Sequence, residues 1–341
     1  MLNTVYRLVA PRRFEVAFND INLLSKDVVV RPTHLSICHA DQRYYQGTRP
    51  AEILEQKLPM ALIHEGIGEV VYDSEGDFKP GEVVVMIPNT PLVQDDVIAE
   101  NYQQSSKFRA SGFDGFMQDL VAMGRDRLVR LPQNVDKTVA AFTELVSVSV
   151  HALRRLDSIA HERREKVGIW GDGNLGYITA IFFKEMFPDT QLYIFGVDRE
   201  KLSGFTFADE VINVRDIPKN LRMDHAIECV GGDASQKAIH QIIDHINPEG
   251  CISILGVSEY PVPINTRMIL EKGLRMFGSS RSGREDFKKT VDIYEKNPKI
   301  LTYLSNLVGA KVEINSIEDM KKAFEVDIQK NLGKTIMIWN K

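Results

Sequence analysis

The segment Gly171-Asp-Gly-Asn-Leu-Gly176 constrains the fold of this chain more strongly than any other. It directly follows the apolar run KVGIW and directly precedes YITAIFFKEMF, whose apolar residues have helical spacing. In such a strand–turn–helix unit the first glycine makes a tight turn, the second lets the backbone approach a pyrophosphate, and the third allows close helix packing. The N-terminus of the helix then faces the negative charge. The sequence therefore predicts a dinucleotide site made by Gly171, Gly173, Asn174, Leu175 and Gly176.

The surrounding residues, 166 to 279, predict an α/β fold. Six apolar, strand-like runs alternate there with segments of helical length: KVGIWG, QLYIFGVD, DEVINV, HAIECVGG, CISILGV and LRMFGSS. Alternation of this kind is typical of a doubly wound parallel sheet covered by helices. We expect the dinucleotide domain to span residues 148–280.

The earlier part of the chain is rich in β-strand patterns. Between residues 27 and 130 short β-branched runs are separated by turns, which predicts an antiparallel, barrel-like region. The stretch TVAAFTELVSVSVHALRRL then has helical spacing and predicts a bridge between domains. Near the end, a helix is expected at REDFKKTVDIYEKN and a strand at KTIMIWN. We expect a β-rich first domain from 1–147, to which residues 281–341 return.

Composition excludes several classes of function. The formal net charge is −5 and no run of lysine or arginine forms a basic footprint, so nucleic-acid binding is not expected. No stretch approaches the roughly 20 apolar residues that span a bilayer. The first residues lack a signal-peptide pattern, and three scattered cysteines suit a reducing compartment, so a cytoplasmic protein is expected.

A second group of residues in the β-rich region indicates a metal site. Cys38, His64 and Glu144 offer a thiolate, an imidazole and a carboxylate, a set that suits a catalytic zinc ion with one position open. Glu65 is either a fourth, exchangeable ligand or an outer group, and Asp41 is placed to orient His64. The text HEGIG has no second histidine at helical spacing, which excludes a metalloprotease.

The choice of dinucleotide is left open by the residues after the second strand. Asp198 lies 22 residues past Gly176, where an acid hydrogen-bonds the adenosine ribose of NAD. Arg199 and Lys201 follow, and their cations would receive the 2′-phosphate of NADP if Asp198 turned away.

Together the segments CHAD, HEGIGEV, FTELVSVSVHAL and GDGNLG, in this order, resemble the zinc-containing medium-chain dehydrogenases and reductases. The resemblance covers nearly the whole chain and implies a groES-like catalytic domain interrupted by a Rossmann domain. Dimers or tetramers are common in such proteins, and a homodimer is expected here. The region from Pro88 to Gly115 contains no cysteine, so one zinc ion per chain is expected. Ala40 replaces the serine or threonine that passes the alcohol proton in relatives, and water, Glu65 or His39 must serve instead.

Glu144 in place of a second cysteine resembles the polyol dehydrogenase branch of this family. Within it, YYQGTRP and LGVSEYPVPINTRMILEKGLRMFGSSRSGREDF make the chain similar to bacterial ribulose-5-phosphate reductases. That resemblance implies NADPH-dependent reduction of D-ribulose 5-phosphate to D-ribitol 5-phosphate, which a partner cytidylyltransferase converts to CDP-ribitol for wall teichoic acid. Guanidinium groups suit the substrate phosphate, and the candidates are Arg43, Arg49, Arg281 and Arg284.

Two other functions are compatible with parts of this pattern. An NAD-dependent sorbitol or xylitol dehydrogenase would share the zinc ligands and use Asp198 to hold the ribose. A non-catalytic dinucleotide-binding module would keep the Rossmann turn alone. The complete set of Cys38, His64 and Glu144 argues against the module, because a module has no structural reason to keep an open metal site.

Overall fold

The computed structural model describes residues 1–341 and contains two compact units. The first unit is discontinuous and consists of Met1–Ser147 and Ser282–Lys341. The second is the continuous stretch Val148–Arg281. Helix α4 (Thr143–Ile159) carries the chain from the first unit into the second. No helix has both the length and the apolar character needed to cross a membrane.

The second unit is built on a six-stranded sheet in the order β13-β12-β11-β14-β15-β16. Every neighbouring pair in this sheet is parallel, and each strand overlaps one of the six runs predicted from the sequence, although β15 begins five residues before its run. The strands are β11 (Lys166–Trp170), β12 (Gln191–Gly196), β13 (Glu210–Asn213), β14 (Met223–Glu228), β15 (Ile246–Ile254) and β16 (Arg275–Gly278).

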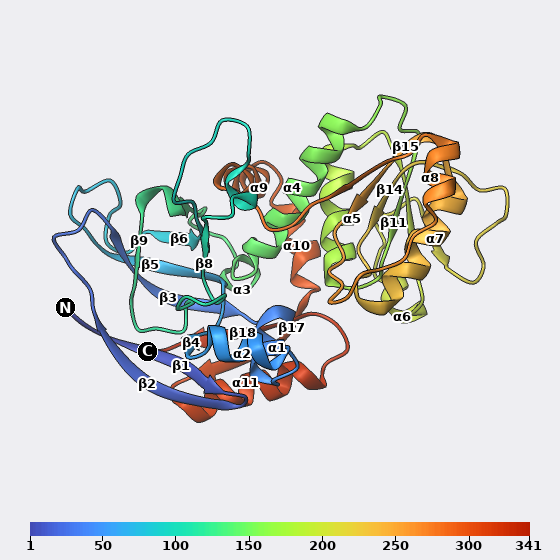
Figure 1. The fold of residues 1–341 in the computed structure, drawn as a ribbon. Coiled ribbons are helices and arrows are strands. Elements are labelled where there is room, and N and C mark those ends of the chain that lie inside the picture. The colour runs from blue at the N-terminus through green and yellow to red at the C-terminus, as the bar shows by residue number, and fades with distance from the viewer. The chain divides into compact units, whose positions relative to one another are not determined.

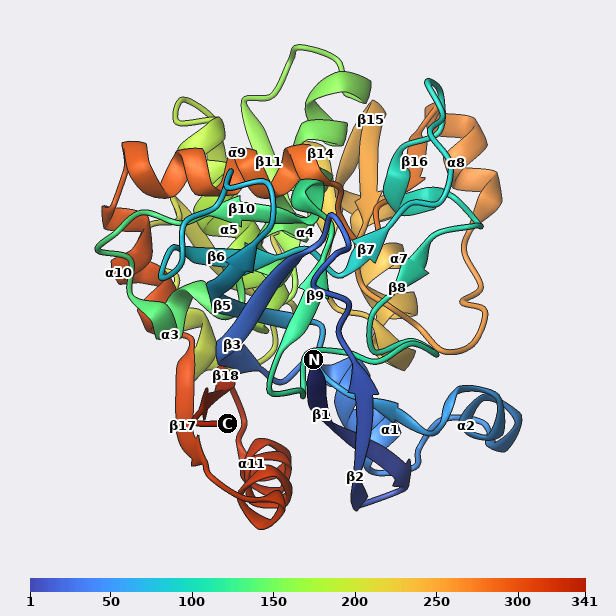
Figure 2. The ribbon, with the colours of Figure 1, turned by 90° about the vertical axis from the view of Figure 1, so that its left-hand side faces the viewer.

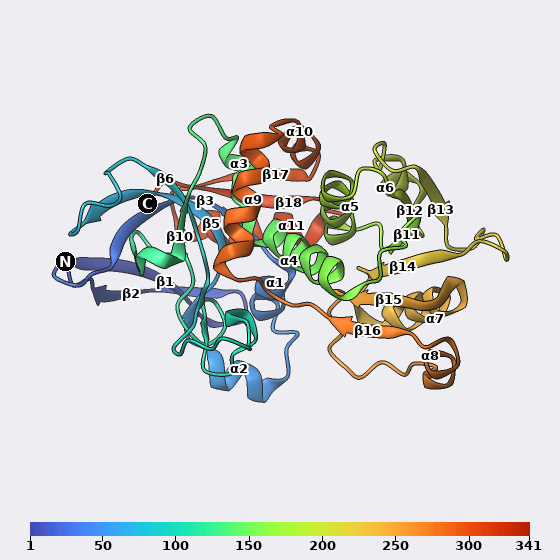
Figure 3. The ribbon, with the colours of Figure 1, turned by 90° about the horizontal axis from the view of Figure 1, so that it is seen from above.

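Helices cover both faces of this sheet, as Figures 1 and 3 show. The helices of the unit are α5 (Asn174–Met186), α6 (Arg199–Ser203), α7 (Ser235–His245) and α8 (Thr266–Lys272), with a short 3-10 helix, η3 (Gly232–Ala234). Apolar side chains of α7 and α8 pack with Trp170, Phe195 and Ile252 of the strands in one core cluster. On the opposite face α5 packs against β11 and β12. This is the doubly wound α/β arrangement that the alternating sequence pattern predicts.

The first unit is rich in antiparallel strands. Its largest sheet has the order β10-β6-β5-β3-β18-β17, with β9 paired to β3, and Figure 2 shows this succession. A three-stranded sheet, β2-β1-β4, and a two-stranded sheet, β7-β8, accompany it. The strands are β1 (Leu2–Ala10), β2 (Arg13–Asp20), β3 (Val28–Ser36), β4 (Met60–Ala61), β5 (Glu65–Asp73), β6 (Val83–Met86), β7 (Asn89–Thr90), β8 (Lys107–Phe108), β9 (Val121–Met123), β10 (Leu128–Arg130), β17 (Val308–Ile314) and β18 (Lys334–Trp339).

The last strand, β18, lies in the middle of the largest sheet. It pairs antiparallel with β3, where Met337 is opposite Leu35, and parallel with β17. Its side chains Met337 and Trp339 belong to the main core of the first unit. The strand predicted at KTIMIWN therefore joins residues near the start of the chain to residues near its end.

The helices of the first unit are mostly short. They are α1 (His39–Tyr45), α2 (Ala51–Lys57), α3 (Lys137–Ala140), α9 (Arg284–Lys296), α10 (Lys299–Ser305) and α11 (Ile317–Gln329), with 3-10 helices η1 (Glu100–Tyr102) and η2 (Arg125–Arg127). The single bridging helix expected from the sequence is divided into α3 and α4. At the division the hydroxyl of Thr143 donates to the carbonyl of Ala140 at 2.8 Å. That bond occupies an acceptor that a continuous helix would use.

Candidate functional site

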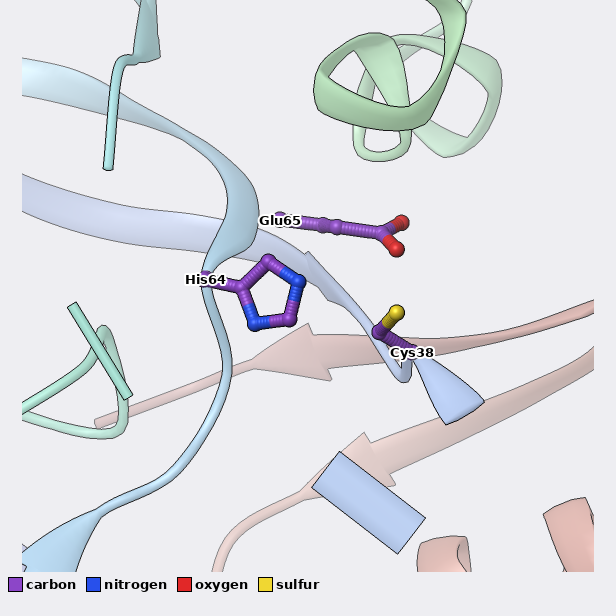
Figure 4. Close-up of side chains that lie close together, drawn as sticks. All are labelled: Cys38, His64 and Glu65. Carbon is purple, nitrogen blue, oxygen red and sulfur yellow. The ribbon is translucent and has the colours of Figure 1, made fainter. Parts of the chain in front are cut away.

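Three potential metal ligands converge at one end of the large sheet in the first unit. Cys38 follows β3 and is the N-cap of α1, His64 precedes β5, and Glu65 is the first residue of β5. Their ligand atoms all lie within 4.8 Å of one another. Figure 4 shows the thiol and the carboxylate facing each other, with the imidazole ring alongside. Neighbouring strands β3 and β5 are hydrogen-bonded here, and this pairing brings the three residues together.

Asp41 fixes the orientation of the histidine. Its carboxylate accepts hydrogen bonds from the backbone N–H of Ile63 at 2.9 Å and of Cys38 at 3.2 Å. Nδ1 of His64 lies 3.5 Å from Oδ2 of Asp41, an ion-pair contact rather than a well-formed hydrogen bond. Burial by itself lowers the pKa of His64, but the charges of Asp41 and Cys38 outweigh burial and raise that pKa well above its ordinary value. A carboxylate at Nδ1 leaves Nε2 as the nitrogen that can bind a metal.

Glu65 is held by a cation from the far end of the chain. Nζ of Lys334, the first residue of β18, donates to Oε1 of Glu65 at 2.8 Å, and both side chains are buried. The other oxygen, Oε2, is buried and has no hydrogen-bond partner. A buried carboxylate oxygen without a partner is costly, which indicates that a ligand belongs there.

Glu144 lies in the first turn of α4, beside the three clustered residues. Burial raises the pKa of its carboxyl to about 7, the charge of His64 acts in the opposite direction, and Glu65 adds to the rise. The group within 4.8 Å contains Glu65 and does not contain Glu144. The structure thus groups Glu65 with Cys38 and His64, and the role of Glu144 as a metal ligand stays a prediction.

The residues present fit a zinc ion. Thiolate, imidazole and carboxylate groups are the ligands that zinc takes in proteins, and a catalytic ion needs three of them with a fourth position open. Cys38, His64 and Glu65 supply one ligand of each kind. Asp41 and Lys334 hold two of these ligands from behind, as outer residues commonly do in metal sites.

In the second unit, the glycine motif forms the turn between β11 and α5. Gly171 has a φ of +132°, and a Cβ there would lie 2.9 Å from the backbone of Cys229. A Cβ on Gly176 would lie 2.0 Å from the carbonyl oxygen of Gly171. Gly173 is the N-cap of α5 and has open space around its Cα. Two glycines are therefore required by packing, and the third leaves room at the N-terminus of α5, which Asn174 and Leu175 begin.

Asp198 caps the N-terminus of helix α6. Its Oδ1 accepts hydrogen bonds from the backbone N–H of Glu200 at 2.9 Å and of Lys201 at 3.2 Å, which makes it the N-cap of α6. Arg199 is exposed on that helix. The capping role turns the acid toward the helix, as the NADP alternative requires.

The four arginines proposed for phosphate binding are separated. Arg43 and Arg49 both act on the imidazole of His39, where burial lowers the pKa and the two charges lower it further, so they lie near the metal cluster. The guanidinium of Arg49 stacks on Tyr44 at 4.4 Å, and its Nε is buried without a hydrogen-bond partner.

The other two arginines are placed differently. Arg284 lines a cavity of about 650 Å³ together with Arg125 and Arg130, and its backbone N–H donates to Glu100. Arg281 belongs to the second unit and has a φ of +58°.

Two residues near these sites were not indicated by sequence motifs. Lys334 is separated from Glu65 by 269 positions, and only the pairing of β18 with β3 reveals the contact. Asp172 lies inside the glycine motif, at a position that the motif leaves free. One signal in the sequence pointed to Asp172, namely that a charged residue stands between two glycines of the motif.

Family models match two parts of the chain. Residues 25–133 match the Alcohol dehydrogenase GroES-like domain, and residues 203–296 match the Zinc-binding dehydrogenase family. A β-rich unit with a thiolate, imidazole and carboxylate cluster, combined with a Rossmann-type unit, defines the zinc-containing medium-chain dehydrogenases and reductases, and this chain belongs to that family.

Particular relatives are similar over the full length. The chain is 55% identical to the Ribulose-5-phosphate reductase of Bacillus spizizenii, with 99% of each chain covered. It is 54% identical to Ribulose-5-phosphate reductase 1 of Staphylococcus aureus, again over 99% of each. The crystal structure of S. aureus TarJ in complex with NADPH superposes with a TM-score of 0.91, 50% identity and complete coverage of both chains.

Proposed function

We propose that this protein is an NADPH-dependent, zinc-containing reductase that converts D-ribulose 5-phosphate to D-ribitol 5-phosphate. The observation that carries this proposal is the 55% identity over 99% of each chain to a ribulose-5-phosphate reductase. The cluster of Cys38, His64 and Glu65 supports it, because carbonyl reduction in this family takes place at such a site. In this proposal the catalytic domain comprises residues 1–147 and 281–341, and the dinucleotide domain comprises 148–280.

Cys38, His64 and Glu65, with Glu144 beside them, are the residues that would hold the metal. When bound there, a zinc ion would supply a Lewis acid that polarises the substrate carbonyl. Asp41 keeps the histidine ring in one orientation, and Lys334 keeps the Glu65 carboxylate in place. These two contacts organise the ligands before the substrate arrives, so little reorganisation is needed during the reaction.

A proton must reach the oxygen that accepts negative charge during reduction. Ala40 has no hydroxyl to pass it on. Water, Glu65 or His39 is therefore the group that we propose passes the proton on.

NADPH supplies the hydride in the proposed reaction. Gly171, Gly173 and Gly176 form the turn that accepts its pyrophosphate, with the N-terminus of α5 facing the negative charge. Asp198 is committed to capping α6, which leaves the cations of Arg199 and Lys201 for the 2′-phosphate. The crystal structure of a relative that is 50% identical contains NADPH, which supports the same cofactor here.

For the substrate phosphate we propose Arg43 and Arg49 as the leading candidates. Both lie near His39, next to the metal ligand Cys38, and the buried Nε of Arg49 lacks a partner. Guanidinium groups bind phosphate through paired hydrogen bonds. Arg281 and Arg284 remain candidates on sequence grounds alone.

We also propose a metabolic role, an oligomeric state and a location for this protein. D-Ribitol 5-phosphate would pass to a cytidylyltransferase that makes CDP-ribitol for wall teichoic acid, and the enzyme itself would act as a homodimer. Its three cysteines, Cys38, Cys229 and Cys251, are all unpaired, which supports a location in the reducing cytoplasm.

The decisive experiment follows the oxidation of NADPH and of NADH after addition of D-ribulose 5-phosphate. Unphosphorylated ribulose, fructose and xylulose serve as control substrates. We expect turnover that needs the phosphate and prefers NADPH. Activity confined to free sugars with NADH would instead identify a general polyol dehydrogenase. Nucleotide binding without any turnover would identify a non-catalytic module.

A further inference from the structure

The carboxylate of Asp172 connects the glycine turn to the loop after the next strand. Its Oδ2 accepts hydrogen bonds from the backbone N–H of Val197 at 2.7 Å and of Asp198 at 2.8 Å. We propose that Asp172 is a positioning residue that fixes the segment 197–201 for selection of the 2′-phosphate of NADPH. This inference rests on the proposed use of NADPH.

The contact between Asp172 and β12 is closely fitted. A Cβ on Gly196, the last residue of β12, would lie 2.6 Å from Oδ2 of Asp172 and 2.7 Å from its Cβ. Glycine at position 196 therefore leaves the space that the carboxylate fills. The backbone also joins the two segments, because the N–H of Gly171 donates to the carbonyl of Phe195 at 2.8 Å.

The segment held by Asp172 contains Asp198, Arg199 and Lys201, the residues that we propose distinguish NADPH from NADH. The N–H of Asp198 is bound by Asp172, and the carboxylate of Asp198 is bound in turn by the N–H groups of Glu200 and Lys201. This sequence of hydrogen bonds holds Asp198 against α6. An Asp198 released from that position would bring a negative charge toward the 2′-phosphate and repel it. Arg199, which is exposed on α6, would attract the same phosphate.

The location of Asp172 is otherwise unfavourable for a negative charge. It lies between Gly171 and Gly173, in the turn that receives the anionic pyrophosphate. A carboxylate there repels the pyrophosphate, so its presence calls for a compensating structural role. Two charge-assisted hydrogen bonds to the neighbouring loop are that role, since each is stronger than a bond to a neutral acceptor.

The test compares two nucleotides that differ only in the 2′-phosphate, adenosine 2′,5′-bisphosphate and adenosine 5′-monophosphate. Their dissociation constants are measured by calorimetry on the zinc-loaded, full-length protein. For Asp172→Ala we expect affinity for the bisphosphate to fall about tenfold more than affinity for the monophosphate. Asp172→Asn keeps an oxygen that accepts both hydrogen bonds and should recover much of the preference. Asp189→Ala removes an exposed acid in the same unit and should change neither constant.

Gly196→Ala provides an independent second variant. Its methyl group displaces the Asp172 carboxylate without altering that residue, so we expect the same selective loss for the bisphosphate. If both substitutions act through one contact, the double variant loses no more selectivity than either single variant. Melting temperatures and zinc content of all variants establish that each is folded and loaded.

Two results would overturn the inference, and they differ in what else they overturn. If the wild-type protein prefers the bisphosphate and Asp172→Ala keeps that preference, or loses affinity for both nucleotides equally, the positioning role is wrong and the use of NADPH stands. If the wild-type protein has no preference for the bisphosphate, the assignment of NADPH is wrong and the inference fails with it.

Discussion

Lys334 and Glu65 form an ion pair from which water is almost excluded. The Lys334 side chain is 4% exposed and that of Glu65 is 0% exposed. Burial lowers the pKa of Lys334, but the charge of Glu65 outweighs this and raises it, so the lysine remains charged. Each buried charge is tolerated in the folded protein because the opposite charge of its partner offsets the cost of removing it from water.

Replacement of Lys334 by methionine tests this dependence. We expect Lys334→Met to lower the unfolding free energy of the metal-free protein by about 3–5 kcal/mol, because Glu65 is left buried and unpaired. Urea denaturation measures the change. The exposed Lys289→Met is the matched control and should have little effect. Addition of Glu65→Gln to Lys334→Met should restore part of the stability, and a double variant as unstable as the single one would contradict the pairing argument.

His225 gives a pH-dependent prediction in the second unit. Its Nδ1 accepts from the backbone N–H of Cys251 at 3.1 Å, so this nitrogen is unprotonated, and Nε2 donates to the carbonyl of His161. Burial is the main cause that lowers the pKa of His225 to about 4. Between about pH 6.5 and pH 4 the unfolded chain therefore binds a proton that the folded protein does not.

Stability should consequently fall as the pH decreases through this range. We expect His225 to account for a loss on the order of 1–3 kcal/mol between pH 7.5 and pH 4. Unfolding free energies of the wild type and of His225→Gln, measured across this range, isolate the contribution. Identical pH dependence in the two proteins would show that His225 is not responsible.

Most residues of the metal site could be predicted from the sequence, but not Lys334. Cys38, His64 and Glu65 lie within or beside short motifs, so their chemistry was readable from residue type and spacing. Lys334 belongs to no motif near them, and its contact depends on strand pairing between distant segments. The sequence left two roles open for Glu65, a fourth ligand or an outer group, because side-chain position decides between them.

At the scale of single elements, the turn between β11 and α5 contains glycines with different requirements. Gly176 has no space for a Cβ, whereas Gly173 has nothing within 4 Å. The fold therefore requires glycine at position 176. At position 173 the requirement comes from the ligand, because a pyrophosphate approaches through the open space at the helix N-terminus.

Alanine at each position should separate these requirements. We expect Gly176→Ala to lower the melting temperature clearly, because its methyl group would overlap the carbonyl of Gly171. Gly173→Ala should melt like the wild type but bind NADPH about tenfold or more weakly. Differential scanning fluorimetry and nicotinamide fluorescence measure the two effects. A Gly173→Ala variant with unchanged NADPH affinity would remove this turn from the binding site.

Elements were predictable where burial imposes a pattern. Strands β11, β12 and β14 of the second unit are almost fully buried and read as continuous apolar runs, which made them recognisable. Strand β2 is exposed at most positions, with Phe18 among its exposed residues, so the usual alternation is missing. Helix α2 has no fully buried residue, and only its partly buried Ile53 and Leu54 pack against the core. Such elements are specified by their neighbours rather than by their own sequence.

At the scale of the whole molecule, the metal residues and the dinucleotide turn belong to different units. Cys38, His64 and Glu65 lie in the first unit, and the turn from Gly171 to Gly176 lies in the second. None of the residues that form the dinucleotide turn is a member of the metal cluster.

Metal removal should therefore stop turnover without removing cofactor affinity. After treatment with a zinc chelator we expect no reduction of D-ribulose 5-phosphate, while the dissociation constant for NADPH stays within about twofold. Nicotinamide fluorescence and metal analysis measure both properties, and added zinc should restore turnover. Cys38→Ser should behave like the chelated protein. Loss of NADPH binding together with zinc would show that the two units do not act separately.

The position of β18 in the sheet has a consequence for the order of biosynthesis. The ribosome has made every strand of the second unit by residue 278, so that unit can fold while synthesis continues. The large sheet of the first unit then still lacks β18, through which β17 is joined to β3. Lys334 reaches Glu65 only with this strand. The nascent chain thus completes its nucleotide-binding unit first, and a premature stop shortly before residue 334 would leave the metal site unfinished.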